Sequence, residues 1–463
     1  MGKFMRDDYR FMKLADANCA LNQKVNLIGI IVEHSTPCRS RGTDWFLSLR
    51  IVDESYHDSG LVVNIFAENE EKLPQIDASG DIIQVSHVVM KSHNAESYAQ
   101  YNKRFSSYAL YEGKYGESCR PYQFSCNFRQ RDQDMTFVVG LRKWVVGVQL
   151  STVTKDSVLL RQLQEGHCCD LVCKIFHVSG VSEDEWMLFI WDGSDAPPLH
   201  IPSKLDDEIE NPLRLQVEPQ SLPKDILCKF PSVGTTLRVS VQRRNVNFHI
   251  SSLITGRWVK FINMTLNVTQ GLWCGVLTRE TKVRFVPSDD IYILERERDF
   301  VERFASNLNR MPFASFPWPA RVTEVDRKAE HVPLATLMDI LTYSQVTAKF
   351  KCIVRVVACV PNKVEDFRSP TGVYRIRVTL EDPTARIHAY LYADDAEVFF
   401  DGYPRTGVLT RKWKLLLGIT DVPSEAAPRN PPWMVCCIKS YSLDDSNAWE
   451  SRRFRIFNTK LVI

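Results

Sequence analysis

The sequence predicts an all-β protein, a tandem array of three small five-stranded barrels with short connecting helices. The first observation is that short runs of alternating apolar residues, such as VNLIGII and WFLSLRI, recur along all 463 residues and are separated by polar turns. The second is that one local pattern occurs three times at domain-sized intervals. The third is the length, which allows about three domains of roughly 150 residues each.

The repeated pattern is a strand-like run, an acidic residue, a turn and another strand-like run. Its copies are LRIVDES with Asp53, MLFIWDGS with Asp192, and IRVTLEDPT with Glu381 and Asp382. The acids are 139 and 190 residues apart, which indicates repeated domains rather than a solenoid. The wider interval contains a proline-rich, acidic stretch at 196–224, which we expect to be a loop insertion.

Small barrels of this size, beginning with a three-stranded meander, are typical of the oligonucleotide/oligosaccharide-binding (OB) fold. We predict OB folds at 1–148, 149–310 and 311–463. The three prolines within 311–326 make this segment the best linker between the second and third folds.

The clearest helix prediction covers Asp290 to Leu308. Its apolar residues recur at helical spacing, so one face should pack against a barrel. The residues expected on that face are Ile291, Leu294, Phe300, Phe304 and Leu308.

The composition excludes several classes of protein. Lys and Arg number 58 and Asp and Glu 56, so the net charge of +2 excludes a uniformly basic nucleic-acid binder. The net charge is 0 for residues 1–150, −3 for 151–300 and +5 for 301–463. Any binding of single-stranded nucleic acid must therefore come from a local groove and from stacking. No apolar run is long enough to cross a membrane, and the N-terminus does not resemble a signal peptide.

Many of the thirteen cysteines lie in apolar runs, as in a reduced nuclear or cytosolic protein, and no CxxC motif occurs. The run HCCDLVCKIFH is best interpreted as buried core cysteine rather than a metal site. Phosphate-binding loops, zinc-protease motifs and nucleophile elbows are absent from the sequence. We therefore predict no enzymatic activity, no metal, no cofactor, no small-molecule substrate and no membrane contact.

The run CRSRGTDW, between the first two predicted strands, is the strongest candidate binding loop. Arg39 and Arg41 suit phosphates or base edges, Gly42 allows close approach of the backbone, and Thr43 and Asp44 can read base edges. A loop in this position lies at the mouth of an OB groove. The alternative is an ordinary polar hairpin loop.

Three further residues of the first domain are candidates. Phe66 ends an otherwise aliphatic strand, where an exposed ring would stack on a base; the alternative is a core phenylalanine. Lys91 and His93 lie at and beyond the end of the next predicted strand and would close the groove. His93 could equally be a solvent-exposed loop residue.

The sequence resembles the protection-of-telomeres family of telomere end-binding proteins, with plant-type members most similar. The resemblance is carried by NLIGIIVE, RGTDWFLSLRIVDES, NIFAENEEKLPQI, GDIIQVSHVVM and SSYALYEG in the first domain, and by LFIWDGSDAPP and GRWVKFINMTL in the second. The third domain matches more weakly, but in the expected position.

The resemblance implies that the first two OB folds bind the single-stranded G-rich 3′ overhang. The family caps chromosome 3′ ends and regulates telomerase access, in the nucleus at telomeres. Its partners are telomere-capping proteins and telomerase, and the C-terminal OB fold docks a protein partner. The segment from Arg41 to Asp44 falls on the family's base-reading loop and Phe66 on a stacking position. Arg243, Arg244, Phe248 and Arg279 would continue the groove into the second domain.

This chain departs from the family pattern where aromatic residues would stack on bases. Glu33, His34 and Ser35 precede the loop, Cys38 lies within it, and His93 stands at a tyrosine position. Arginines replace aromatic residues in the second domain. Each lost stacking residue would cost about 1–3 kcal/mol of binding.

These departures leave two rival functions open. One is a scaffold that binds telomerase or capping proteins and contacts DNA weakly. The other is a general single-stranded DNA-binding protein, which would show little preference for G-rich repeats.

Overall fold

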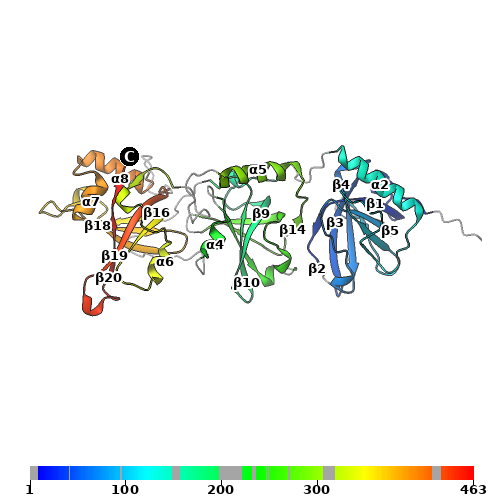
Figure 1. Cartoon of the computed structure of the whole chain (residues 1–463), viewed down its shortest axis with the longest axis horizontal. Helices are drawn as coiled ribbons and strands as arrows, with labels where there is room; N and C mark the ends of the chain where they lie inside the picture. The colour runs from blue at the N-terminus through cyan, green and yellow to red at the C-terminus, as the bar shows by residue number, and fades with distance from the viewer. Residues whose placement is uncertain are drawn as a thin grey trace, which may run out of the picture.

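A computed structural model describes residues 9–40, 42–93, 96–148, 157–197, 222–231, 236–246, 248, 250–269, 272–305, 319–419 and 429–462. Three β-barrels lie in a row along the long axis of the molecule, in chain order (Figure 1). Most of the predicted loop insertion at 196–224 lies outside the described residues, as do the predicted domain boundaries at 149 and 310–311. Those boundaries stay predictions.

The first barrel contains five strands that pair in a closed ring, β1–β3–β4–β6–β5 and back to β1. They are β1 (Lys24–Ser35), β3 (Trp45–Asp53), β4 (Tyr56–Ala67), β5 (Ile82–His93) and β6 (Glu96–Gln100). The other elements are α1 (Leu14–Cys19), β2 (Cys38–Arg39), η1 (Glu70–Lys72), β7 (Ser107–Tyr111), β8 (Gln123–Phe124) and α2 (Asp132–Val146).

The second barrel repeats the ring as β9–β10–β11–β13–β12 and back to β9. Its strands are β9 (Cys168–Ser182), β10 (Glu185–Trp191), β11 (Leu237–Gln242), β12 (Trp258–Thr269) and β13 (Leu272–Val276). The other elements are η2 (Leu160–Gln162), α4 (Lys224–Leu227), η3 (Arg243–Asn245), η4 (Ile250–Ser252), β14 (Lys282–Phe285) and α5 (Ile291–Ala305).

The third barrel closes as β16–β17–β18–β20–β19. Its strands are β16 (Ala348–Val360), β17 (Arg375–Glu381), β18 (Arg386–Tyr392), β19 (Met434–Ser442) and β20 (Arg452–Phe457). The other elements are β15 (Thr323–Val325), η5 (Arg327–Ala329), α6 (Leu337–Thr342), η6 (Val364–Phe367), α7 (Ala393–Phe400), α8 (Thr406–Leu416), η7 (Asp445–Asn447) and β21 (Thr459–Leu461).

All three rings share one topology. The strands follow the order first, second, third, fifth, fourth, and the third strand pairs in parallel with the fifth in every case. This is the connectivity of the five-stranded Greek-key OB barrel. The predicted all-β fold of OB type is confirmed, although the connecting helices α2 and α5, at 15 residues each, are longer than the short helices predicted.

The repeated acidic residue has the same structural role in each barrel. One oxygen of Asp53 accepts a hydrogen bond from the backbone N–H of Leu14 at the start of α1, and the other accepts from the following turn. Asp192 and Asp382 bind the N–H groups that begin η2 and α6 in the same way. Each carboxylate thus satisfies N–H groups of a helix start and of a turn, so the repeat is structural rather than catalytic.

The predicted helix after the second barrel exists, but its packing face differs from the prediction. Ile293 is fully buried, whereas Ile291 and Leu294 are 42% and 50% exposed. Phe300 packs against Phe176 and Trp191 of the barrel core. The apolar spacing was correct for a helix, but the buried stripe is rotated toward Ile293. The side chain of Phe304, and Leu308, lie outside the described residues.

The first two barrels are connected by a continuous sheet. Strand β14 pairs with β12 of the second barrel and also with the end of β1, where His34 lies opposite Phe285 and Ser35 opposite Arg284. The second and third barrels meet through apolar side chains, because Ile353 of β16 belongs to the core of the second barrel. The three barrels therefore form one packed array.

The cysteine prediction holds only in part, because within HCCDLVCKIFH Cys173 is buried but Cys168 is exposed and Cys169 is half-buried. Cys173, Cys352, Cys359, Cys436 and Cys437 are buried in the barrels, and burial raises the pKa of each thiol. Among the described residues no group of three or more metal-ligating side chains occurs. No helix in the described part of the chain is long and apolar enough to span a membrane.

Candidate nucleic-acid interface

An aromatic pair lies on the outer face of the first barrel. Phe46 on β3 is directly opposite Phe66 on β4, and their ring centroids are 5.0 Å apart. The next pair, Leu47 and Ile65, points into the core, so the two phenylalanines point outward. Both rings are half-buried and neither belongs to the core. The interpretation of Phe66 as a core residue is therefore wrong, and its role in stacking stays a prediction.

Beside this pair is a hollow of about 440 Å³. Its walls combine three aromatic residues with cationic and polar groups. The lining residues are Asp44, Phe66, Gln100, Tyr101, Asn102, Lys103, Arg104 and Phe105. Lys103 binds both carboxylate oxygens of Asp44, at 2.8 and 3.0 Å. The hollow thus brings two predicted residues together with a cationic turn.

Sequence reasoning missed this turn. Lys103, Arg104 and Phe105 follow β6, and the ring of Phe105 is 66% exposed. The turn reaches Phe66 because β6 pairs in parallel with β4, where Asn64 lies opposite Gln100. A signal was present in the sequence, since KRF combines two cations with an aromatic residue, as surfaces that bind single-stranded nucleic acid do.

The candidate loop folds into a compact hairpin around β2. Arg39 donates a hydrogen bond to the carbonyl oxygen of Thr43 at 3.1 Å, and its guanidinium lies 4.6 Å from the ring centre of Trp45. The N–H of Ser40 donates to the carbonyl of Asp44, and that of Gly42 to the hydroxyl of Ser40. Arg41 lies outside the described residues.

Lys91 and His93 are exposed at the end of β5. They lie opposite Tyr98 and Glu96 of β6, and neither lines the hollow. Their role in closing the groove stays a prediction.

The second-barrel candidates form a cationic cluster. Arg279 donates from Nε to the carbonyl oxygen of Arg244 at 3.3 Å, and Arg243 lies 3.4 Å from a carboxylate oxygen of Asp184. All three arginines are exposed. Phe248 forms a β-bridge with Cys38, so the second barrel reaches the candidate loop of the first at this point.

The departures at Glu33, His34 and Ser35 have a structural explanation. All three are buried where the end of β1 meets β14, a region we call the inter-barrel joint. Burial, with the nearby charges of Arg257 and Arg284, lowers the pKa of His34 to about 4. Glu33 binds Arg50 at 2.9 Å. These residues support the packing of two barrels rather than contact with single-stranded DNA.

Two known protein families match parts of this chain. The family described as "Telomeric single stranded DNA binding POT1/CDC13" matches residues 5–154, and the family described as "POT1A-like, OB fold domain" matches residues 318–447. A solved structure of fission yeast Pot1 with single-stranded DNA is 16% identical, covers 64% of this chain and 95% of that chain, and has a TM-score of 0.28.

Two curated relatives match over nearly the whole length. The chain is 39% identical to protection of telomeres protein 1b of Arabidopsis thaliana, covering 98% of both chains. It is 37% identical to protection of telomeres protein 1a of the same plant, covering 99% of both. With this identity over full length, the chain belongs to the protection-of-telomeres family.

Proposed function

We propose that this protein binds the single-stranded G-rich DNA of telomeres, caps chromosome 3′ ends and regulates the access of telomerase. The observation that carries the proposal is the outward Phe46–Phe66 pair beside the cationic hollow, on the strands that bind oligonucleotides in OB folds. We place this activity in the nucleus, at telomeres, and propose a binding protein without catalytic function.

The proposed mechanism divides contacts between bases and phosphates. A base stacks on the phenylalanine pair, because every base offers a π-face to an aromatic ring. Lys103 and Arg104 are close enough to neutralise neighbouring phosphates, and Asp44 holds the Lys103 ammonium in place. Arg39, Arg41, Gly42 and Thr43 would contact base edges and backbone from the adjoining loop.

The second barrel would extend this path. The exposed guanidinium groups of Arg243, Arg244 and Arg279 suit phosphates, which they can bind through two parallel hydrogen bonds. The β-bridge between Cys38 and Phe248 keeps the candidate loop next to the second barrel. An end held along both barrels would be inaccessible to nucleases and to telomerase.

Partner docking completes the proposal. Telomere-capping proteins and telomerase are the expected partners, and the third barrel is their proposed docking domain on the basis of family membership.

A binding titration tests the proposal. Full-length protein is titrated with a G-rich telomeric strand, its C-rich complement and a scrambled strand, and the variant Phe66→Ala is compared. Loss of one stacking contact, about 1–3 kcal/mol, should weaken G-strand binding roughly 5- to 150-fold. Phe124→Ala is the matched control, because this ring is 58% exposed on the same barrel and lies outside the hollow.

Each other result selects a different function. G-strand binding that is weak and unchanged by Phe66→Ala would favour the scaffold. Tight binding of all three strands with equal affinity would favour a general single-stranded DNA-binding protein. The slope of log affinity against log salt, about −0.7 for each phosphate neutralised, would count the ionic contacts.

A further inference from the structure

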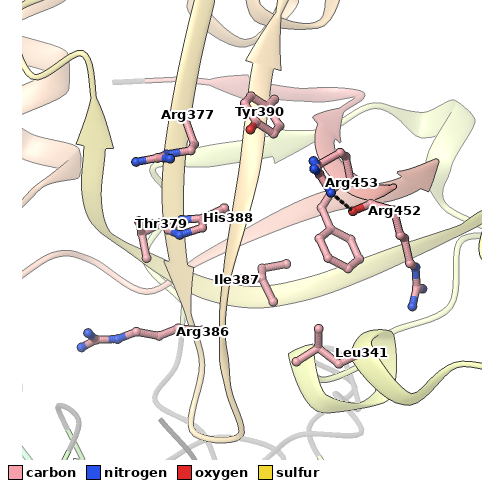
Figure 2. Close-up of a pocket in the computed structure, with 10 residues that line it drawn as sticks. Leu341, Arg377, Thr379, Arg386, Ile387, His388, Tyr390, Arg452 and Arg453 are labelled. Carbon is pink, nitrogen blue, oxygen red and sulfur yellow. Dashed lines mark hydrogen bonds between the residues drawn. The ribbon is translucent and has the colours of Figure 1, made fainter. Parts of the chain in front are cut away.

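The third barrel has a cationic cavity of its own, of about 430 Å³. It lies between the β17–β18 hairpin, the start of β20 and α6 (Figure 2). Four arginines, a histidine and two aromatic rings line it, together with two aliphatic side chains and one hydroxyl. The lining residues are Leu341, Arg377, Thr379, Arg386, Ile387, His388, Tyr390, Arg452, Arg453 and Phe454.

Strand register places the polar lining on the outer face of the barrel. Arg377 is opposite Tyr390, and Thr379 is opposite His388. The residues between them, Val378 and Ala389, belong to the core, so these four side chains point away from it. Thr379 Oγ1 lies 3.2 Å from His388 Nδ1, which fixes the imidazole in the wall.

The cavity carries a surplus of positive charge. Its lining includes no carboxylate. The nearest one on these strands, Glu381, is fully buried and already pairs with Arg355 and Arg386. The Arg377 side chain makes no hydrogen bond or ion pair with any other described residue. Burial, together with the nearby Arg377 charge, lowers the pKa of His388. The cavity therefore suits an anionic ligand.

Aromatic groups alternate with these cations. The Arg452 guanidinium lies 5.2 Å from the ring centre of Phe454 and 5.4 Å from that of Trp449. Trp449, in the loop between β19 and β20, is 55% exposed. Nε of Arg452 is buried and has no hydrogen-bond partner in the described part of the chain. A cation next to an exposed ring, as Arg452 is next to Trp449, is the arrangement that binds single-stranded nucleic acid through phosphates and stacked bases.

The position within the fold favours the same ligand. β17 and β18 are the second and third strands of this barrel, and the loop with Trp449 joins its fourth and fifth strands. These are the surfaces with which OB folds bind oligonucleotides. β3 and β4 carry the Phe46–Phe66 pair in the equivalent place on the first barrel.

We propose that the β17–β18–β20 cavity of the third barrel is a further binding site for single-stranded nucleic acid. Arg377 and Arg453 contact phosphates, and Tyr390, Phe454 and Trp449 offer surfaces for bases. These contacts are to phosphates and to the faces of bases, so the site should tolerate any sequence. The inference extends the proposed DNA binding from two barrels to three.

The test uses full-length protein and strands of two lengths. A strand of about 12 nucleotides can occupy the first barrels, and one of about 36 can reach all three, because an OB fold covers about 4–16 nucleotides. The variant Arg377→Glu with Arg453→Glu should weaken binding of the long strand about 10-fold or more. It should also reduce the magnitude of its salt slope by about 1.4, for two lost phosphate contacts. Binding of the short strand should change less than 2-fold.

The matched control is Lys363→Glu with Arg411→Glu, which makes the same charge change at two exposed positions of the third barrel outside the cavity. Arg377→Gln with Arg453→Gln repeats the test with less perturbation if the first variant fails to fold. A long strand carrying photoreactive pyrimidines should cross-link to peptides containing Tyr390, Trp449 or Phe454.

Three results would overturn the inference. The first is equal long-strand affinity for the cavity variant and its control. The second is an equal loss for short and long strands. The third is that a poly-glutamate peptide binds the wild type but not the cavity variant, while both proteins bind the long strand with the same affinity. That result would assign the cavity to an acidic protein partner. Phe66→Ala reports on the first barrel separately, so its failure and failure of the cavity variant are distinguishable.

Discussion

Replacing His34 by phenylalanine should remove a pH-dependent part of the free energy that holds the first two barrels together. The imidazole is 7% exposed and lies 5.1 Å from the ring centre of Phe285, across the inter-barrel joint. Nδ1 lies 3.2 Å from the carbonyl oxygen of Ser35, to which the neutral ring donates. Desolvation is the largest cause that lowers its pKa; Arg257 and Arg284 add to it, and Glu33 opposes it.

The magnitude follows from the two pKa values. An unfolded chain protonates His34 below its ordinary pKa of 6.5, whereas the folded joint does so only below about 4. The neutral ring therefore makes its full contribution to the free energy of unfolding above pH 6.5. This contribution is lost as the pH falls from 6.5 to about 4. Because one pH unit is worth about 1.4 kcal/mol, the full loss over about 2.5 pH units is about 3.5 kcal/mol, and about 2 kcal/mol of it is lost by pH 5.

The assay is urea unfolding of the full chain at pH 7.5 and pH 5.0, with hydrogen exchange of peptides from β1 and β14 reporting on the joint. Acidic side chains titrate in both proteins, so the difference between wild type and His34→Phe isolates this histidine. Between pH 7.5 and pH 5.0, the free energy of unfolding of the variant relative to wild type should rise by about 2 kcal/mol. His57→Gln, an exposed histidine of the same barrel, is the control. A difference constant within about 0.5 kcal/mol would refute the reasoning, because surface substitutions already vary by that much.

Two further predictions concern packing within single barrels. Asp382→Asn replaces one carboxylate oxygen by an N–H donor, so either the Leu337 N–H or the N–H groups of the turn lose their acceptor. The free energy of unfolding, measured by thermal unfolding, should fall by about 1–3 kcal/mol. An unchanged melting transition would show that the carboxylate is not needed. Gly113→Ala would place a Cβ 2.2 Å from the carbonyl oxygen of Gly80, so the backbone must move at a cost of about 1–3 kcal/mol. Gly140→Ala meets open space on α2 and should instead stabilise by about 0.5–1 kcal/mol; equal effects of the two glycine substitutions on the melting temperature would contradict the geometry.

The fold was predictable because each strand buries one side against its own barrel. This imposes a local period of two, which can be read in runs such as the one around Leu47 and Leu49. The three acidic turns were visible for the same reason, since each capping carboxylate is followed directly by its turn. Their partners at the helix starts are more than thirty residues away, and no local pattern reveals them.

The site was only partly predictable because it is assembled from distant segments. Phe66 and Asp44 belonged to recognisable motifs, and the structure brings both to one hollow. The turn with Lys103 joins them only through the parallel pairing of β4 and β6. The role of His34 depends on Phe285, which lies in another barrel. Contacts between barrels leave no periodic trace in sequence, so such residues look like lost stacking positions.

The pairing of β14 with β1 has a consequence for synthesis of the chain on the ribosome. Every strand of the first ring, and its capping Asp53, precedes residue 101, so this barrel can close while the second is still being made. Until Arg284 and Phe285 emerge, one edge of β1 at His34 and Ser35 stays open, because β3 pairs only along the other edge. An open strand end invites pairing with another nascent chain. During synthesis there is thus an interval in which the first barrel is complete but still has an exposed strand edge. The interval ends when β14 pairs with that edge.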